Sequence, residues 1–134
     1  MVAVQGISHV GIAVSNLEVA IQHFSSLLGS NDVEQMEVPN ENVRVAMIKV
    51  GNTEIELLSP TSESGAIAKF IRERGEGIHH LAVRVPSVSQ AIEEARTQGF
   101  RLIDEVPRRG AGGTDAAFVH PKSMHGVLLE FYSR

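Results

Sequence analysis

Cysteine is absent from the chain of 134 residues, so a disulfide framework and catalysis by a thiolate nucleophile are both excluded. Long apolar runs are also missing, because no stretch approaches the roughly 20 residues that a membrane-spanning helix requires. The first residues lack the charged start and long apolar run of a secretory signal. We therefore expect a cytoplasmic protein that does not span a membrane.

Positive charge is in short supply as well. Lys and Arg number 12 against 16 Asp and Glu, which gives a formal net charge of −4. Nucleic-acid binding requires a basic face that neutralises phosphates, so no nucleic-acid partner is expected. The length and the 43% of hydrophobic residues predict a single compact domain over residues 1–134.

An internal repeat is the main feature that the chain does contain. The run His9-Val-Gly-Ile-Ala-Val14 matches His80-Leu-Ala-Val-Arg-Val85, and both runs are short and rich in β-branched residues. Each run therefore predicts a strand that opens with a histidine.

Each of these strands is followed by the start signal of a helix. Ser15 and Ser87 each stand three residues before a Glu or a Gln, which is the pattern of a capping box. We expect the two serines to cap helices that end at Gly29 and Gly99, because glycine favours the left-handed cap conformation. The two halves of the chain therefore begin alike.

Three further strands are predicted in each half. They are expected at residues 32–38, 43–50 and 54–58 and at residues 101–106, 116–119 and 126–132, with Gly51-Asn52 as a hairpin turn. Each half is then a βαβββ module, at about residues 5–60 and 76–133, and a linker helix is expected at about 62–75. The fold class is α+β. A helix covers only one face of each sheet, so we expect the two curved sheets to pair their bare faces around a cleft.

Strand alternation selects the side chains that face this cleft. In the first strand the bulky residues cover the helix, which leaves His9 on the cleft side, and His80 is its equivalent in the second module. The same alternation in the last strand of each module turns Glu56 and Glu130 toward the cleft. Each module is therefore expected to offer one histidine and one glutamate.

Two imidazoles and two carboxylates form a suitable ligand set for a borderline divalent metal such as Zn, Co, Mn, Ni or Fe, whereas calcium prefers more oxygen ligands. Taken singly, a strand histidine or glutamate is usually a solvated or hydrogen-bonded surface residue. The corresponding positions in the two modules favour a metal site at His9, Glu56, His80 and Glu130.

Longer motifs cover most of the chain. They are Ile7-Ser-His-Val-Gly-Ile-Ala-Val14, Gly51-Asn-Thr-Glu-Ile-Glu-Leu-Leu-Ser-Pro60, Gly75-Glu-Gly-Ile-His-His-Leu-Ala82, Pro107-Arg-Arg-Gly-Ala-Gly112 and His120-Pro-Lys-Ser-Met-His-Gly-Val-Leu-Leu-Glu130. With these motifs the chain resembles the methylmalonyl-CoA epimerases of the vicinal oxygen chelate (glyoxalase/bleomycin resistance) superfamily over essentially its whole length. The last motif, with the Gly-Ala-Gly loop before it, is the most discriminating.

This resemblance implies a glyoxalase-like fold, an acyl-CoA substrate and a homodimer. It implies that His9, Glu56, His80 and Glu130 hold a divalent metal, for which Co, Zn, Mn and Ni are alternatives. The implied reaction interconverts (2R)- and (2S)-methylmalonyl-CoA, removing the α-proton on one face and returning a proton on the other. A divalent cation suits this chemistry because it can stabilise the enolate.

Glu130 is our candidate for one acid/base role, and inversion requires a second proton donor on the opposite face. Some relatives carry a glutamate as second acid/base on the third strand of the first module and a glutamine as fourth metal ligand. The corresponding positions here are Val45 and Glu56. We therefore hypothesise that Glu56 serves as the acid/base opposite Glu130 and binds the metal directly or through water.

Several residues are candidates for substrate contacts. Arg84 is expected on the cleft side, where it can pair with a substrate carboxylate or form an ion pair at a strand edge. Lys122, Ser123, Arg108 and Arg109 are candidates for a CoA phosphate or, alternatively, solvated loop residues. The role of His120, beside Pro121, stays open. The loop Gly110-Ala-Gly-Gly113 lacks the following Lys-Ser/Thr of a nucleotide-binding loop and is expected to be a turn or a substrate-side loop.

Three other functions compete with the epimerase interpretation. A glyoxalase I-like isomerase uses a comparable metal and glutamate arrangement, but the His-Pro-Lys-Ser run at residues 120–123 disfavours it. An extradiol dioxygenase needs iron with two His and one Glu, so a fourth ligand at Glu56 disfavours that reading. A non-enzymatic protein that binds small molecules on the same fold would not need a full set of metal ligands, so the four expected ligands disfavour this function.

Overall fold

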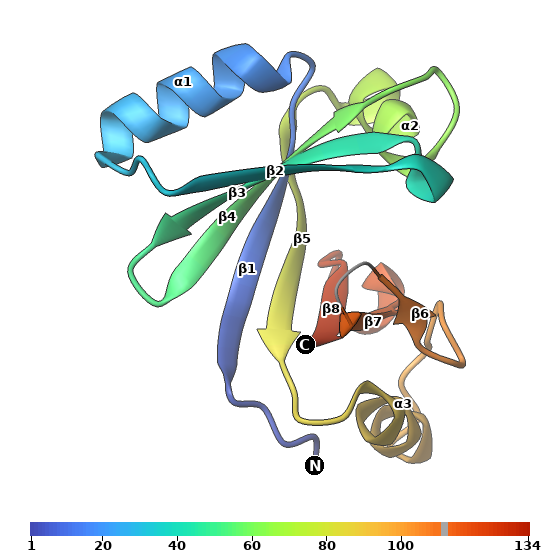
Figure 1. Cartoon of the computed structure of the whole chain (residues 1–134). Coiled ribbons are helices and arrows are strands. Elements are labelled where there is room, and N and C mark those ends of the chain that lie inside the picture. Colours follow the sequence, from blue (N-terminus) through green and yellow to red (C-terminus); the bar gives the residue numbers. More distant parts are fainter. Residues whose placement is uncertain (111–112) are drawn as a thin grey trace. The chain divides into compact units, whose positions relative to one another are not determined.

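The computed structural model of the protein describes residues 1–110 and 113–134. The chain forms two compact units, one of His9–His79 and one of His80–Arg134 together with Met1–Ser8. We call them the 9–79 unit and the 80–134 unit. The chain passes between the units inside strand β1 (Gly6–Ala13) and again inside strand β5 (Gly77–Arg84) (Figure 1).

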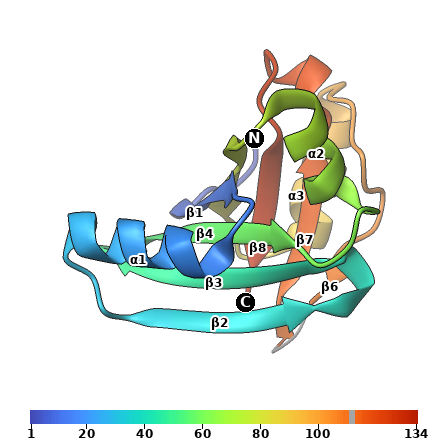
Figure 2. The same cartoon turned by 90° about the horizontal axis from the view of Figure 1, so that it is seen from above.

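The 9–79 unit contains a mixed sheet in the order β2-β3-β4-β1. Its strands besides β1 are β2 (Val33–Val38), β3 (Val43–Val50) and β4 (Thr53–Pro60), and its helices are α1 (Leu17–Leu28), α2 (Ala66–Arg74) and the short 3-10 helix η1 (Pro39–Glu41). Strands β2, β3 and β4 are antiparallel to their neighbours, whereas β1 runs parallel to β4. Helix α1 lies against β3 and β4 (Figure 2), where Leu17 and Ala20 are buried with Ile48 and Leu57.

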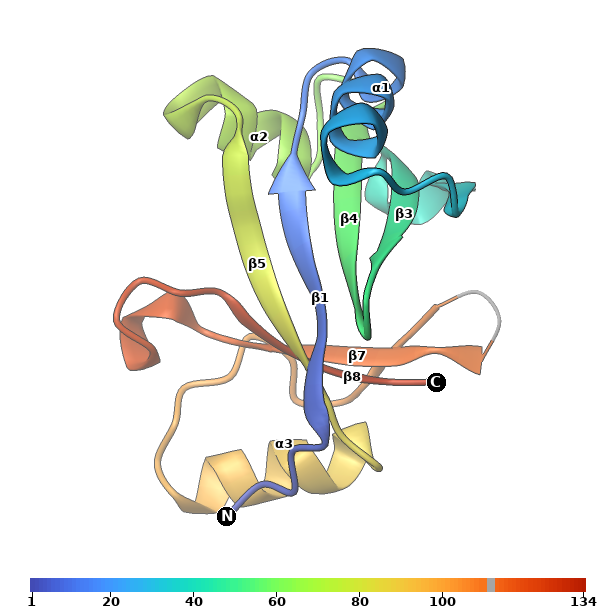
Figure 3. The ribbon, with the colours of Figure 1, turned by 90° about the vertical axis from the view of Figure 1, so that its left-hand side faces the viewer.

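The 80–134 unit repeats this arrangement in the order β5-β8-β7-β6. Its elements after β5 are α3 (Val88–Thr97), β6 (Arg108–Arg109), β7 (Asp115–Val119), the 3-10 helix η3 (Pro121–Ser123) and β8 (Leu129–Ser133). Strand β5 runs parallel to β8, as β1 does to β4. Helix α3 lies against β7 and β8 (Figure 3), where Val88 and Ile92 are buried with Val119 and Phe131.

The element order βαβββ therefore occurs twice, and the α+β class with two such modules is confirmed. Helix α2 lies within the segment predicted as a linker helix, and the Gly51-Asn52 turn joins β3 to β4 as predicted. A single domain over residues 1–134, with modules near 5–60 and 76–133, stays a prediction. Among the helices of the described residues, none is both long and apolar enough to cross a membrane.

The start of α1 differs from the prediction by one residue. Asn16, not Ser15, is the cap, because its Oδ1 accepts the Val19 N–H at 3.0 Å. Ser15 lies outside the helix, and its backbone N–H donates to Glu76 Oε2 at 2.7 Å. Asparagine caps helices as well as serine does, and Asn16 takes the position that the Ser-x-x-Glu pattern assigns to Ser15.

The other helix boundaries agree more closely with the sequence pattern. Ser87 caps α3 as predicted, since its Oγ accepts the Gln90 N–H at 3.2 Å. Gly29 ends α1 in the left-handed conformation (φ 66°). Helix α3 ends at Thr97 with Gln98 as its cap, and Gly99 (φ 87°) then turns the chain.

A strand at residues 101–106 was predicted, and this prediction is wrong. Within that segment only Leu102 forms an isolated bridge, to Val119. The reason is Asp104, whose Oδ2 accepts the Phe118 N–H at 2.9 Å, so a side chain takes the place of a backbone carbonyl in the ladder. The edge strand of this sheet is instead Arg108–Arg109, paired with β7.

The last strand is also shorter than the predicted 126–132. Strand β8 begins at Leu129, because the backbone N–H groups of Gly126 and Val127 donate to Pro121 O and Met124 O. These two residues therefore belong to the turn that follows β7.

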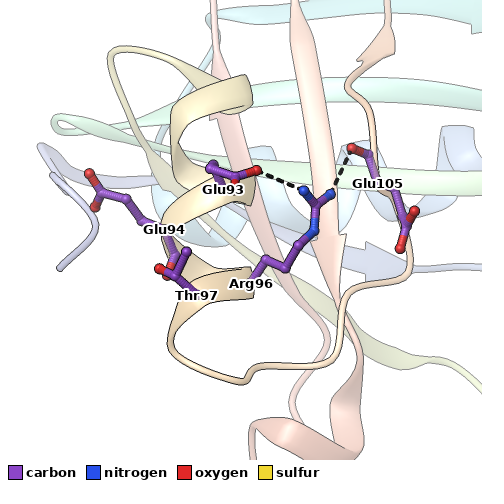
Figure 4. A network of polar contacts seen from close by, with 5 residues as sticks. All are labelled: Glu93, Glu94, Arg96, Thr97 and Glu105. Atoms are coloured by element: carbon purple, nitrogen blue, oxygen red, sulfur yellow. Dashed lines mark hydrogen bonds and ion pairs between the residues drawn. The ribbon is translucent and has the colours of Figure 1, made fainter.

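The end of α3 is held by a small polar network (Figure 4). Arg96 donates through Nη1 to Glu93 Oε2 at 2.7 Å and through Nη2 to Glu105 O at 3.3 Å, while Thr97 Oγ1 donates to Glu94 O at 2.9 Å. Arg96 thus ties the helix to the segment that replaces the predicted strand.

The cap of α1 provides a test of stability. Asn16→Ala removes the acceptor for Val19 N–H and is expected to lower the free energy of unfolding by about 1 kcal/mol. Ser15→Ala is the matched control and is expected to change it by less than about 0.5 kcal/mol. Urea denaturation followed by circular dichroism measures both values, and an equal loss in the two variants would contradict the assignment of the cap.

Candidate functional site

The 9–79 unit holds one of the predicted histidine and glutamate pairs. His9 lies in β1 and Glu56 in β4, and the parallel register sets Glu56 opposite Gly11, two residues beyond His9. Residues at alternate positions share a face, so the two side chains are on the same side of the sheet. His9 Nε2 and Glu56 Oε1 are 3.7 Å apart, and the His9 side chain is only 3% exposed.

The 80–134 unit holds the second pair in the same arrangement. Glu130 in β8 stands opposite Ala82, again two residues beyond the histidine, His80. His80 Nε2 and Glu130 Oε1 are 3.2 Å apart, and both side chains are buried. In each unit the small residue between them, Gly11 or Ala82, leaves room for the imidazole and the carboxylate to approach.

The donor atoms of each pair fit two neighbouring ligands of one metal ion. Bonds of roughly 2.0 to 2.2 Å from a metal to nitrogen and oxygen place adjacent ligand atoms about 3 to 3.5 Å apart. The separation in the 80–134 unit falls in this range, and that in the 9–79 unit lies slightly beyond it. Imidazole nitrogen with carboxylate oxygen suits Zn, Co, Mn or Ni, so the residues present fit the implied divalent metal.

Val45 lies in an apolar part of the same sheet face as Glu56. In the antiparallel register Val45 stands opposite Leu58, one alternation away from the Met47 and Glu56 pair. Its side chain is buried, in a cluster with Val43, Leu58 and other apolar residues. The position where some relatives carry an acid/base is therefore packed with hydrocarbon in this protein.

An aromatic contact supports His80. The rings of His80 and Phe118 meet edge to face, with centroids 5.8 Å apart and an interplanar angle of 88°. The guanidinium of Arg108 lies over the Phe118 ring at 5.0 Å, and Asp104 Oδ1 accepts from Arg108 Nε at 2.8 Å. Phe118 stands opposite Glu130 in the ladder, so it shares the face of the histidine and glutamate pair.

Phe118 and Asp104 were missed from the sequence. Strand alternation in β7 gives the sheet face on which Phe118 lies, but it does not show that β7 pairs with β8 and so places Phe118 beside Glu130. The contact between Asp104 and the Phe118 N–H joins a loop residue to a strand residue, and no local pattern indicates it.

The candidate substrate residues lie at different places in the 80–134 unit. Arg84 is exposed at the end of β5, on the same face of the strand as His80. Lys122 and Ser123 lie in η3, where the Lys122 N–H donates to His120 Nδ1 and Ser123 Oγ accepts the Arg101 N–H. Their contacts with a substrate stay predictions.

The two adjacent arginines are both engaged with carboxylates. Arg108 binds Asp104, and Arg109 Nη1 is 2.6 Å from both carboxylate oxygens of Asp115. These ion pairs favour the interpretation of both arginines as structural residues of the loop. In the predicted Gly110-Ala-Gly-Gly113 loop, residues 111 and 112 lie outside the described residues.

His120 has an electrostatic environment that opposes its charge. Partial burial lowers the pKa of the imidazole from its ordinary value, and the nearby cations Arg101 and Lys122 lower the pKa further. The neutral form of His120 is therefore favoured, in agreement with Nδ1 serving as a hydrogen-bond acceptor.

Comparison with known proteins adds an independent set of findings. The sequence profile of the Glyoxalase/Bleomycin resistance protein/Dioxygenase superfamily matches residues 8–118. The Ethylmalonyl-CoA/methylmalonyl-CoA epimerase of Cereibacter sphaeroides is 35% identical, over 92% of this chain and 94% of that protein.

Two solved structures are similar over nearly the whole chain. The crystal structure of methylmalonyl-CoA epimerase from Mycobacterium tuberculosis has a TM-score of 0.91 at 39% identity, covering 99% of this chain and 92% of that one. A variant of the Streptomyces coelicolor methylmalonyl-CoA epimerase in complex with 2-nitronate-propionyl-CoA has a TM-score of 0.92 at 32% identity, covering 98% and 95%. The predicted glyoxalase-like fold is confirmed by these similarities.

Proposed function

Because the chain belongs to the Glyoxalase/Bleomycin resistance protein/Dioxygenase superfamily, we propose that it is a divalent-metal-dependent epimerase that interconverts (2R)- and (2S)-methylmalonyl-CoA. The observation that carries the proposal is the same histidine and glutamate pair in both units, with His9 beside Glu56 and His80 beside Glu130. The similarity to methylmalonyl-CoA epimerases supports the choice of substrate.

In this proposal the two pairs hold one metal ion together. His9, Glu56 and His80 have the donor types that a metal ion requires, and Glu130 completes the set as the partner of His80. Co, Zn, Mn and Ni are the candidate ions.

Glu130 and Glu56 are proposed to move the protons. When bound, the divalent cation polarises the thioester and stabilises negative charge on it. Glu130 takes the α-proton at one carboxylate oxygen on one face of the substrate, and Glu56 supplies a proton from the opposite face, so the α-carbon is inverted. Burial of Glu130 excludes water from the carboxylate, and His80 Nε2 lies 3.2 Å from Glu130 Oε1.

Val45 is the reason for assigning the second acid/base role to Glu56. A valine in a hydrocarbon cluster has no proton to transfer, whereas Glu56 lies on the same sheet face with its carboxylate beside His9. Arg84, Lys122 and Ser123 are proposed to complete the active site by contacting anionic groups of the acyl-CoA substrate. A homodimer remains part of the proposal and is tested by light scattering of the purified protein.

Epimerase activity is tested by proton NMR of methylmalonyl-CoA in deuterated water with Co²⁺ present. We expect enzyme-dependent loss of the α-proton signal, and a chelator is expected to stop it. The hemithioacetal of methylglyoxal and glutathione is the control substrate and is expected not to react. Exchange of that substrate without exchange of methylmalonyl-CoA would replace the proposal by a glyoxalase I-like activity.

The division of roles between the two glutamates is tested by Glu56→Gln. This variant is expected to keep α-proton exchange from one enantiomer but to lose inversion by on the order of 100-fold or more, because one face loses its proton donor. Glu34→Gln, on the exposed part of β2, is the matched control and is expected to leave inversion unchanged. Inversion at the normal rate in Glu56→Gln would refute the assignment.

The shared ion is tested by counting bound metal. Native mass spectrometry is expected to find one Co²⁺ per chain, and His9→Ala and His80→Ala are each expected to weaken Co²⁺ binding on the order of 100-fold, measured by calorimetry. His23→Ala, an exposed residue of α1, serves as the control. Two Co²⁺ ions per chain, or weaker Co²⁺ binding in only one of the two histidine variants, would mean that the pairs do not share a metal.

A further inference from the structure

A closed set of hydrogen bonds joins the turn after β7 to the segment after α3. The His120 N–H donates to Arg101 O at 2.8 Å, and the Arg101 N–H donates to Ser123 Oγ at 2.9 Å. Both backbone groups of Arg101 are therefore bound by the turn. Two hydrogen bonds to Arg101 therefore fix the position of residues 120–123 in the 80–134 unit.

His120 caps the turn of residues 121–123 through its own side chain and carbonyl. Its Nδ1 accepts the Lys122 N–H at 3.0 Å, and its carbonyl accepts the Ser123 N–H at 2.9 Å. Ser, Asp and Asn are the usual caps of such turns, because their oxygens accept at every pH of interest. An imidazole differs from them, since Nδ1 accepts a hydrogen bond only while it carries no proton.

Two side chains of this turn can bind a ligand, one as a cation and the other as a hydrogen-bond donor. The Lys122 side chain is exposed, and its backbone N–H is already bound to His120. Ser123 Oγ takes the Arg101 N–H with a lone pair, so its own hydroxyl proton can be donated to another acceptor. An ammonium group and a hydroxyl donor on consecutive residues suit an anionic oxygen.

We propose that His120 is the positioning residue of an anion-binding turn, in which the neutral imidazole caps Lys122 and holds Lys122 and Ser123 for an anionic oxygen of the acyl-CoA. This inference rests on the proposed function for the identity of the ligand. The capping itself is a property of the fold and does not depend on that identity.

The cap makes ligand binding dependent on pH. Partial burial is the main cause that disfavours protonation of His120, and the cations Arg101 and Lys122 disfavour it further. The pKa is lowered, so the folded protein binds the proton less readily than the unfolded chain does. The stabilisation by the cap is therefore fully present above the ordinary pKa of histidine and declines below it, and the cap itself is lost as the pH falls through the lowered pKa of the folded protein.

The experiment compares His120→Ala with His120→Asn. Asparagine keeps an acceptor that does not titrate, whereas alanine removes the acceptor. Titration calorimetry with malonyl-CoA at neutral pH is expected to show affinity lowered by about five- to tenfold in His120→Ala and close to wild type in His120→Asn. His23→Asn is the control for the loss of an exposed histidine and is expected to leave the affinity unchanged.

The pH profile separates positioning from a merely structural role. Wild-type affinity for malonyl-CoA is expected to fall as the pH is lowered through the depressed pKa of His120, and His120→Asn is expected to lose this part of the profile. The same comparison with propionyl-CoA locates the anionic oxygen. A loss confined to malonyl-CoA assigns the carboxylate, and an equal loss with both assigns a phosphate of CoA.

The amide resonance of Lys122 provides a readout without any ligand or activity. Its chemical shift in ¹⁵N-labelled protein is expected to follow the titration of His120 in the wild type and to be constant in His120→Asn. A protein that binds malonyl-CoA equally in all variants overturns the inference. If methylmalonyl-CoA is not epimerised while the Lys122 shift and the affinities change as expected, only the proposed function fails.

Discussion

Placing an imidazole beside a carboxylate inside a folded protein is the constraint on which this structure depends. An isolated buried carboxylate costs several kcal/mol, so Glu130 requires a partner at hydrogen-bond or metal-ligand distance. His80 meets that requirement, and His9 plays the same part for Glu56. Parallel pairing of the first and last strand of each module brings the two side chains together, and the helix covers the opposite face. The helix-facing residues stabilise the fold, and the other face carries the histidine and glutamate pairs and, in the 9–79 unit, the apolar cluster around Val45.

Much of this arrangement could be predicted because it follows from short-range rules. The period of two in a strand selects His9 and His80, and the repeat selects Glu56 and Glu130. Both pairs are found in the structure at the predicted strands. The predictions that failed depend on single side chains. Asn16 competes with Ser15 as a cap, and Asp104 takes a ladder hydrogen bond from Phe118.

The contacts that support the site could not be predicted for a related reason. Phe118 reaches His80 only because β7 lies beside β8, and the sequence does not contain that neighbour relation in any local pattern. The turn that His120 caps is likewise bound to Arg101, which is distant in the chain but adjacent in the fold. Side chains that position the site are thus set by tertiary contacts, whereas the reactive side chains themselves are set by strand periodicity.

The parallel register has a consequence for insertions and deletions. A strand advances about 3.3 Å per residue, so adding one residue inside β4 or β8 would turn the glutamate to the helix side, and adding two would move it about 6.6 Å from its histidine. Neither change preserves the pair. The Gly51-Asn52 turn at the start of β4 lies outside this register, so length variation there leaves the pairing of β1 with the residues around Glu56 intact. Tolerance to length change in this chain should therefore stop sharply at the strand ends.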